Sequence, residues 1–124
     1  MASERRSFPR YLVQCPVIVT LPDDPNAAFK VKANSLSRTS IQIECNQELI
    51  TSLLRQQGLP YRCHLTFTLP WHEQNFAVDA TVVTHRRLSQ QDYVLVLLLR
   101  HQDGAQEDLL EQLLGARPTT IGLD

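Results

Sequence analysis

The sequence has few of the residues from which common functional sites are built. Its 124 residues include only four glycines and three cysteines. Four glycines leave little room for a glycine-rich loop that binds phosphate through its main chain. No Cys or His pair has the spacing of metal ligands, and no paired acidic motif is present, so we expect no metal site, no cofactor and no enzyme.

Long apolar runs and a strong net charge are also missing. The longest apolar block, Val94–Leu99, is far shorter than the ~20 residues of a membrane-spanning helix, so we expect no membrane insertion and interpret the block as a strand buried on both faces. The N-terminus lacks a secretory signal, and three widely spaced cysteines favour reduced core thiols in a cytoplasmic protein. A formal net charge of −1 argues against a general DNA or RNA binder.

The residues that are present predict one folded domain with mainly β structure. Hydrophobic residues make up 43% of the chain and charged residues 20%, which is typical of a folded protein. Alternating apolar and polar residues predict six strands. These strands are expected within Tyr11–Thr20, Phe29–Ala33, Ile41–Cys45, Tyr61–Leu69, Phe76–Val82 and Tyr93–Leu99. Turn formers at 21–26 and a polar connection at 35–40 separate the first three strands.

Two helices are expected between and after the strands. Asn46 can cap a short helix that ends near Gly58 and Pro60. Asp103 and Gln106 have the spacing of a capping box for a final helix that ends at Gly115. The apolar faces are Leu49, Ile50, Leu53 and Leu54 in the first helix, and Leu109, Leu110, Leu113 and Leu114 in the second. Six short strands at hairpin spacing predict a small closed antiparallel β-barrel, with the final helix over one opening.

An N-terminal arm, residues 1–10, carries three arginines just before the first predicted strand. Arg5, Arg6 and Arg10 each offer a planar fork of donors that matches phosphate oxygens and can stack on bases. Arginine also outnumbers lysine by 10 to 2 in the whole chain. The arm therefore suggests a phosphate clamp, although a solvated basic tail has the same composition.

The remaining candidate residues give weaker signals. None of the four histidines has a Cys, Ser or Asp at a spacing that indicates catalysis, and surface positions on strands explain them best; they are His64, His72, His85 and His101. Trp71 lies in a turn, where we expect it to cover the barrel rather than to anchor a partner.

The arm and the polar connection together resemble the PilZ domain, over about residues 4 to 115. The family carries Arg-x-x-x-Arg, which fits Arg6 to Arg10, with Arg5 as the doubled arginine. Its second motif, Asp/Asn-x-Ser-x-x-Gly, is present in outline as Ser35, Ser37 and Ser40. The resemblance implies a PilZ-like split barrel at 11–115, a flexible arm at 1–10 and a loose tail at 116–124.

The resemblance also implies cyclic di-GMP (c-di-GMP) as ligand. Arg6 and Arg10 would bind its phosphates and guanines, and Ser37 would donate a hydrogen bond to it. Arg5 would be the additional contact found where the family binds a stacked pair of ligand molecules. Ser35 replaces an Asp or Asn, an exchange expected to cost ~1–3 kcal/mol, or roughly ten- to hundredfold in affinity. Ser40 replaces a Gly and is expected to distort the turn or crowd the ligand.

Three functions follow, in decreasing order of support. The first is a c-di-GMP receptor and adaptor whose arm changes conformation on binding and signals to a protein partner in signalling or motility. The second is a PilZ-like interaction module without a nucleotide, favoured by Ser35 and Ser40. The third is a nucleic-acid-binding barrel, which would need a basic face with interleaved aromatics that the sequence does not indicate.

Overall fold

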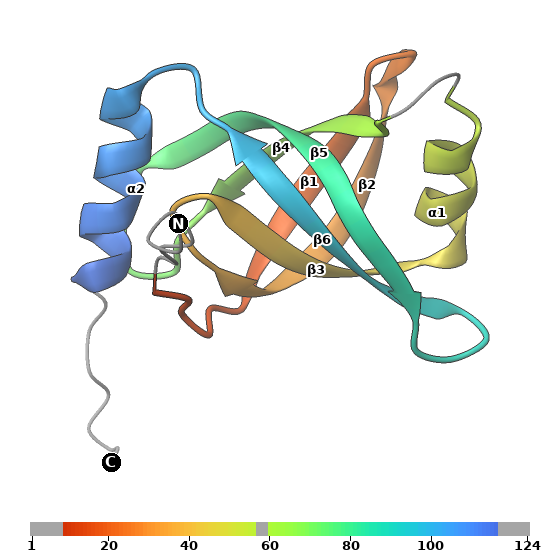
Figure 1. The fold of residues 1–124 in the computed structure, drawn as a ribbon, viewed down its shortest axis with the longest axis horizontal. Helices are drawn as coiled ribbons and strands as arrows, with labels where there is room; N and C mark the ends of the chain where they lie inside the picture. The colour runs from red at the N-terminus through yellow and green to blue at the C-terminus, as the bar shows by residue number, and fades with distance from the viewer. Residues whose placement is uncertain (1–8, 57–59, 117–124) are drawn as a thin grey trace, which may run out of the picture.

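A computed structural model describes residues 9–56 and 60–116 and shows a closed antiparallel barrel with a helix at either end (Figure 1). The elements are β1 (Cys15–Leu21), β2 (Asp24–Leu36), β3 (Ser40–Asn46), α1 (Gln47–Leu54), β4 (Arg62–Thr68), β5 (Asn75–Arg87), β6 (Asp92–Arg100) and α2 (Gly104–Gly115). Around the barrel the strands follow the order β1-β2-β3-β6-β5-β4, with every neighbouring pair antiparallel. The predicted six-stranded barrel with an inserted helix and a terminal helix is confirmed.

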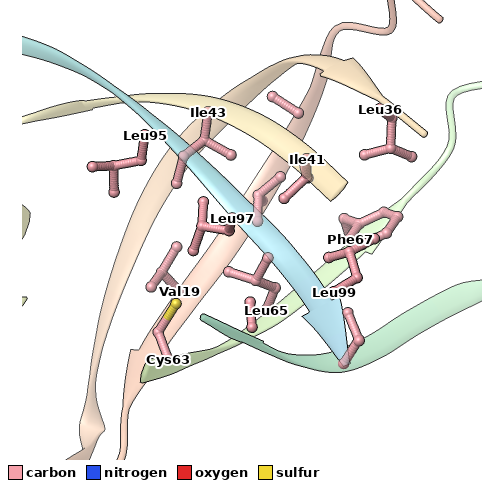
Figure 2. Packing of buried hydrophobic residues seen from close by; sticks show 14 of the residues in the cluster. Val19, Leu36, Ile41, Ile43, Cys63, Leu65, Phe67, Leu95, Leu97 and Leu99 are labelled. Carbon is pink, nitrogen blue, oxygen red and sulfur yellow. The ribbon is translucent and has the colours of Figure 1, made fainter. Parts of the chain in front are cut away.

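The core fills the barrel because alternate residues of each strand point inward. Figure 2 shows side chains from different strands meeting in the interior, among them Val19, Ile43 and Leu97. Burying one such side chain contributes about 1.5–3 kcal/mol. The prediction that Val94–Leu99 is buried on both faces is wrong at Leu98, which is 48% exposed on the outside, although Val94 on the same face is 6% exposed. The reason is that no second layer covers the outer wall there.

Strand boundaries differ from the sequence prediction at both ends of the first hairpin. β1 begins at Cys15, and Tyr11 instead forms an isolated bridge with Leu36. The expected loop at 21–26 shrinks to a turn at 22–23, because Leu21 pairs directly with Asp24. β2 also continues through Ser35 and Leu36, so the polar connection is confined to 37–39.

Capping residues start the two helices as expected. The Asn46 side chain accepts a hydrogen bond from the main-chain N–H of Leu49 at 3.2 Å, and Asp103 accepts one from that of Gln106 at 2.9 Å. The buried side chains are Leu49, Ile50 and Leu53 in α1 and Leu110 and Leu114 in α2. Leu54 was assigned to the buried face of α1 and is exposed instead. Gly58, predicted to end α1, lies outside the described residues.

Trp71 fixes α2 to the barrel. Its indole Nε1 donates to the main-chain oxygen of Leu113 at 2.9 Å, and its ring packs partly buried against the core. An exposed strand-to-strand turn is thereby joined to the covering helix, which agrees with the structural role expected for this residue. None of the helices in the described ranges is long and apolar enough to cross a membrane.

The three cysteines are buried and free. Burial raises the pKa of the Cys15 and Cys45 thiols to about 11 and that of Cys63 to about 12. Because the reactive form of cysteine is the thiolate, these groups are inert in the folded protein at neutral pH. The expected core positions of the three cysteines are confirmed, and their reduced state stays a prediction.

Candidate functional site

The turn between β2 and β3 is shaped by the side chain of Ser37. The main-chain N–H of Ser37 donates to the main-chain oxygen of Ser40 at 2.8 Å. Its own hydroxyl oxygen accepts from the N–H groups of Thr39 and Ser40, at 3.2 and 3.1 Å. Serine is suited to this turn because its short hydroxyl reaches main-chain donors two and three residues on. Ser37 is 4% exposed, so these bonds are shielded from water and hold the turn in one shape.

Arg10 reaches this turn from the N-terminal arm. The two main-chain hydrogen bonds between Tyr11 and Leu36, at 2.8 and 2.9 Å, lay the end of the arm along the end of β2. The Arg10 guanidinium then donates from Nη2 to the Ser40 hydroxyl at 2.8 Å and from Nη1 to the Ser40 main-chain oxygen at 3.4 Å. Partial burial against the turn lowers the pKa of Arg10. The fold thus joins two motifs that lie 30 residues apart in the sequence.

The hydrogen-bond pattern indicates which hydroxyl hydrogen is left without an acceptor in the cluster. Ser37 Oγ already accepts two N–H bonds, so its own hydrogen is best donated to Ser40 Oγ, 3.1 Å away. Ser40 Oγ also accepts from Arg10, which can only donate. The hydrogen of the Ser40 hydroxyl is therefore available to a further acceptor. Beside it lie the remaining N–H groups of Arg10, which together suit an anion.

The other expected site residues are placed differently. Ser35 pairs with Gln42 on the outer face of the barrel, and the residue is only 6% exposed. Arg5 and Arg6 lie outside the described residues. Ser40 begins β3 and pairs with Leu98, so the regular register of β3 and β6 is kept at this position.

Two features of the site were not predicted. Leu98, half exposed opposite Ser40, adds an apolar platform next to the polar cluster. Arg38, at the tip of the turn, reaches α2, where Nε contacts Glu107 at 2.9 Å and Nη2 contacts Asp108 at 2.7 Å. The hydrogen bond to Glu107 raises the pKa of Arg38. No sequence pattern indicates either contact, because both depend on strand register and on where the last helix packs.

His101 strengthens the connection between the turn and α2. Its Nε2 lies 2.7 Å from the main-chain oxygen of Arg38, and its Nδ1 lies 3.1 Å from the Gln106 side chain. This histidine is therefore a structural link and not an isolated surface residue. In the described part of the chain, no three His, Cys, Asp or Glu side chains are grouped closely enough to hold a metal ion.

The chain resembles known proteins in structure but not in sequence. No model of a protein family matches the sequence, and no curated protein matches it. Among solved structures, the chain is similar to the Inhibitor of motility MotI/DgrA of Bacillus subtilis, with a TM-score of 0.68 and 16% identity over 91% of this chain and 51% of that one.

Two further structures are c-di-GMP complexes. One is MrkH of K. pneumonia, with a TM-score of 0.64 and 12% identity over 90% of this chain and 54% of MrkH. The other is PlzA of Borreliella burgdorferi, with a TM-score of 0.58 and 10% identity over 88% of this chain and 48% of PlzA. The chain spans about half the length of these proteins. The likeness confirms the expected PilZ-like fold.

Proposed function

We propose that this chain is a c-di-GMP receptor. The observation that carries the proposal is the hydrogen-bonded cluster in which Arg10 Nη2 meets Ser40 Oγ at 2.8 Å and Ser40 Oγ meets Ser37 Oγ at 3.1 Å. The cluster unites the arm with the serine-rich turn, the two parts that the resemblance to PilZ domains implies for ligand binding. The c-di-GMP complexes of MrkH and PlzA, which share the fold, support the same ligand.

The chemistry of the cluster suits a cyclic dinucleotide. Arg10 offers a charged fork that fits a phosphate or the O6/N7 edge of guanine. The hydroxyl of Ser40 adds a donor, and Leu98 offers an apolar surface for a flat base. Arg5 and Arg6 complete the clamp in this proposal, with Ser35 as a buried support in place of the family's Asp or Asn.

We infer that the domain acts as an adaptor and not as an enzyme. Binding would close the arm over the turn, and the altered surface would be recognised by a protein partner. The ion pairs from Arg38 to Glu107 and Asp108 give this turn a physical connection to α2, where such a partner could detect the change. Action in the cytoplasm stays a prediction from the sequence.

An interaction module that binds no nucleotide is the second candidate. Its support is Ser35, which is buried and lacks the charge of the Asp that the family's motif carries. Retention of Arg10 at hydrogen-bond distance from Ser40 favours the receptor over this alternative.

Calorimetric titration of c-di-GMP into the purified protein tests the receptor directly. We expect binding in the micromolar range or tighter, because three arginines contribute charge-assisted contacts that offset the weaker serine at position 35. A ratio near two ligand molecules per chain would implicate Arg5. No heat and no thermal stabilisation at excess ligand would contradict the proposal and favour the interaction module.

Replacing Ser37 by alanine is expected to weaken c-di-GMP binding about tenfold, because two main-chain N–H groups lose the acceptor that shapes the turn. Ser89→Ala is a matched control, since Ser89 Oγ accepts from the N–H groups of Gln91 and Asp92 in the β5–β6 turn, at 3.3 and 3.2 Å. Ser37→Ala should cost more stability than Ser89→Ala, because the Ser37 bonds are shielded and those of Ser89 are exposed to water, so affinities are compared at a temperature where both variants are folded. Equal affinity in the two variants would show that Ser37 has no part in binding.

A further inference from the structure

A second polar depression lies on the outer wall of the barrel, formed mainly by β4, β5 and β6. It encloses about 550 Å³, and its lining includes Arg62, His64, Asp79, Thr81 and Arg100. Strand register explains why these side chains gather, since Arg62 is opposite Thr81, and Asp79 lies between His64 and Arg100. Side chains directly opposite on one face lie about 4.5–5.5 Å apart at Cβ. The depression shares no lining residue with the cluster around Ser40.

Two arginines of this wall have unused donors. Within residues 9–56 and 60–116, neither the Arg62 nor the Arg100 guanidinium has a hydrogen-bonded or ionic partner. Asp79 is the cross-strand partner of Arg100, yet its carboxylate contacts His64 Nδ1 instead, at 2.9 Å. The main chain of Arg62 is itself fixed, because the Gln56 side chain bonds both its N–H and its oxygen, at 3.1 and 2.6 Å. The wall carries two arginines and one aspartate, so positive charge exceeds negative charge there.

Thr81 provides an observation that is independent of the two arginines. Its residue is 9% exposed, and its hydroxyl is buried without any hydrogen-bond partner in the described structure. Buried hydroxyls are normally bonded, because an unsatisfied one costs about 1–3 kcal/mol. Arg62, the cross-strand partner of Thr81, is exposed, so an acceptor bound by its guanidinium would lie next to this hydroxyl.

We propose that this depression binds a phosphomonoester, with the phosphate held by Arg62, Arg100 and the Thr81 hydroxyl. Arginine forks match phosphate oxygens, and a threonine hydroxyl donates a third bond. The volume exceeds what a lone phosphate needs, and the exposed Pro22 lines the same depression with apolar surface. The body of the ligand is therefore apolar and packs against Pro22.

Titration of phenyl phosphate into the full ¹⁵N-labelled chain, followed by NMR, tests the proposal. We expect amide shifts at residues 62–64, 79–81 and 100, with weaker binding of inorganic phosphate. The double variant Arg62→Ala/Arg100→Ala should bind phenyl phosphate at least about tenfold more weakly. The control Arg55→Ala/Arg86→Ala removes the same charge from other exposed positions and should bind like the parent.

Thr81→Val separates binding from folding. Valine keeps the shape of the side chain and removes an unpartnered hydroxyl, so the thermal stability of the variant should equal or exceed that of the parent. Its affinity for phenyl phosphate should fall about tenfold. The proposal is overturned by unchanged binding in the arginine double variant, by shifts centred on residues 37–40, or by no binding at millimolar phenyl phosphate. If inorganic phosphate bound as tightly as phenyl phosphate, the inference that the body of the ligand is apolar would be overturned. The variant Arg62→Ala/Arg100→Ala should keep the parent's affinity for c-di-GMP. Failure of this proposal can therefore be distinguished from failure of the receptor proposal.

Discussion

Replacing both Arg6 and Arg10 by alanine is expected to weaken c-di-GMP binding by roughly 100- to 10,000-fold. Each arginine is proposed to make a charge-assisted contact, and such contacts contribute about 1.5–3 kcal/mol each. Arg10 is already held at the site by its 2.8 Å bond to Ser40, so its loss removes a positioned donor as well as a charge. Calorimetry on the double variant and on each single variant measures the effect.

The control for this experiment is again Arg55→Ala/Arg86→Ala, which lowers the net charge equally. If c-di-GMP were attracted only by overall charge, both double variants would lose affinity to the same modest degree, and the loss would vanish at high salt. Parental affinity in Arg6→Ala/Arg10→Ala would refute the receptor site. The Arg10→Ala single variant is the sharper comparison with the structure, because Arg6 lies outside the described residues.

Leu97→Ala is expected to cause the largest loss of stability, about 2–5 kcal/mol. Leu97 is fully buried in the middle of β6, where Figure 2 shows it beside other core side chains, and alanine would leave a cavity that a closed barrel cannot easily collapse. Stability of a domain this size is typically 5–15 kcal/mol, so the change is a large share of the total. The midpoint of thermal unfolding should fall by about 10–20 °C.

Leu98→Ala, one residue further along the same strand, provides the control. Leu98 faces the outside and is half exposed, so the substitution should cost less than about 1 kcal/mol. The same loss of stability in the two variants would contradict the assignment of inner and outer faces in β6. Chemical denaturation gives both free energies of unfolding under one set of conditions.

The sequence predicted the barrel well because its signals are local. Alternation in β1, β3 and β4 and the caps at Asn46 and Asp103 depend only on neighbouring residues. Boundaries were less predictable because pairing overrides local preference. Asp24 joins a strand because it pairs with Leu21, and Leu98 is exposed because nothing packs over it.

The candidate site was predictable in part. Arg10, Ser37 and Ser40 came from the resemblance of two motifs, and the fold brings these three together. Arg38 could not be found in this way, since its partners lie about 70 positions away on a helix whose orientation the sequence does not encode locally. The depression at Thr81 was missed for the same reason, because it depends on the register of β4, β5 and β6.

Labelling of the buried thiols can measure local opening of the barrel wall; these thiols belong to Cys15, Cys45 and Cys63. With a pKa of about 11, only about one Cys15 thiol in ten thousand is ionised at pH 7, so a thiol reagent reacts with it almost only when the surrounding strand opens. The three sit on β1, β3 and β4, so their separate labelling rates report local opening at three places in the wall. Ligand binding at the β2–β3 turn would slow the labelling of Cys15 most, because Cys15 pairs with Ala33 near the end of β2 and Tyr11, four residues before it, bridges to Leu36. Cys45 is at the far end of β3 and should respond less, and the natural chain needs no added probe to reveal the difference.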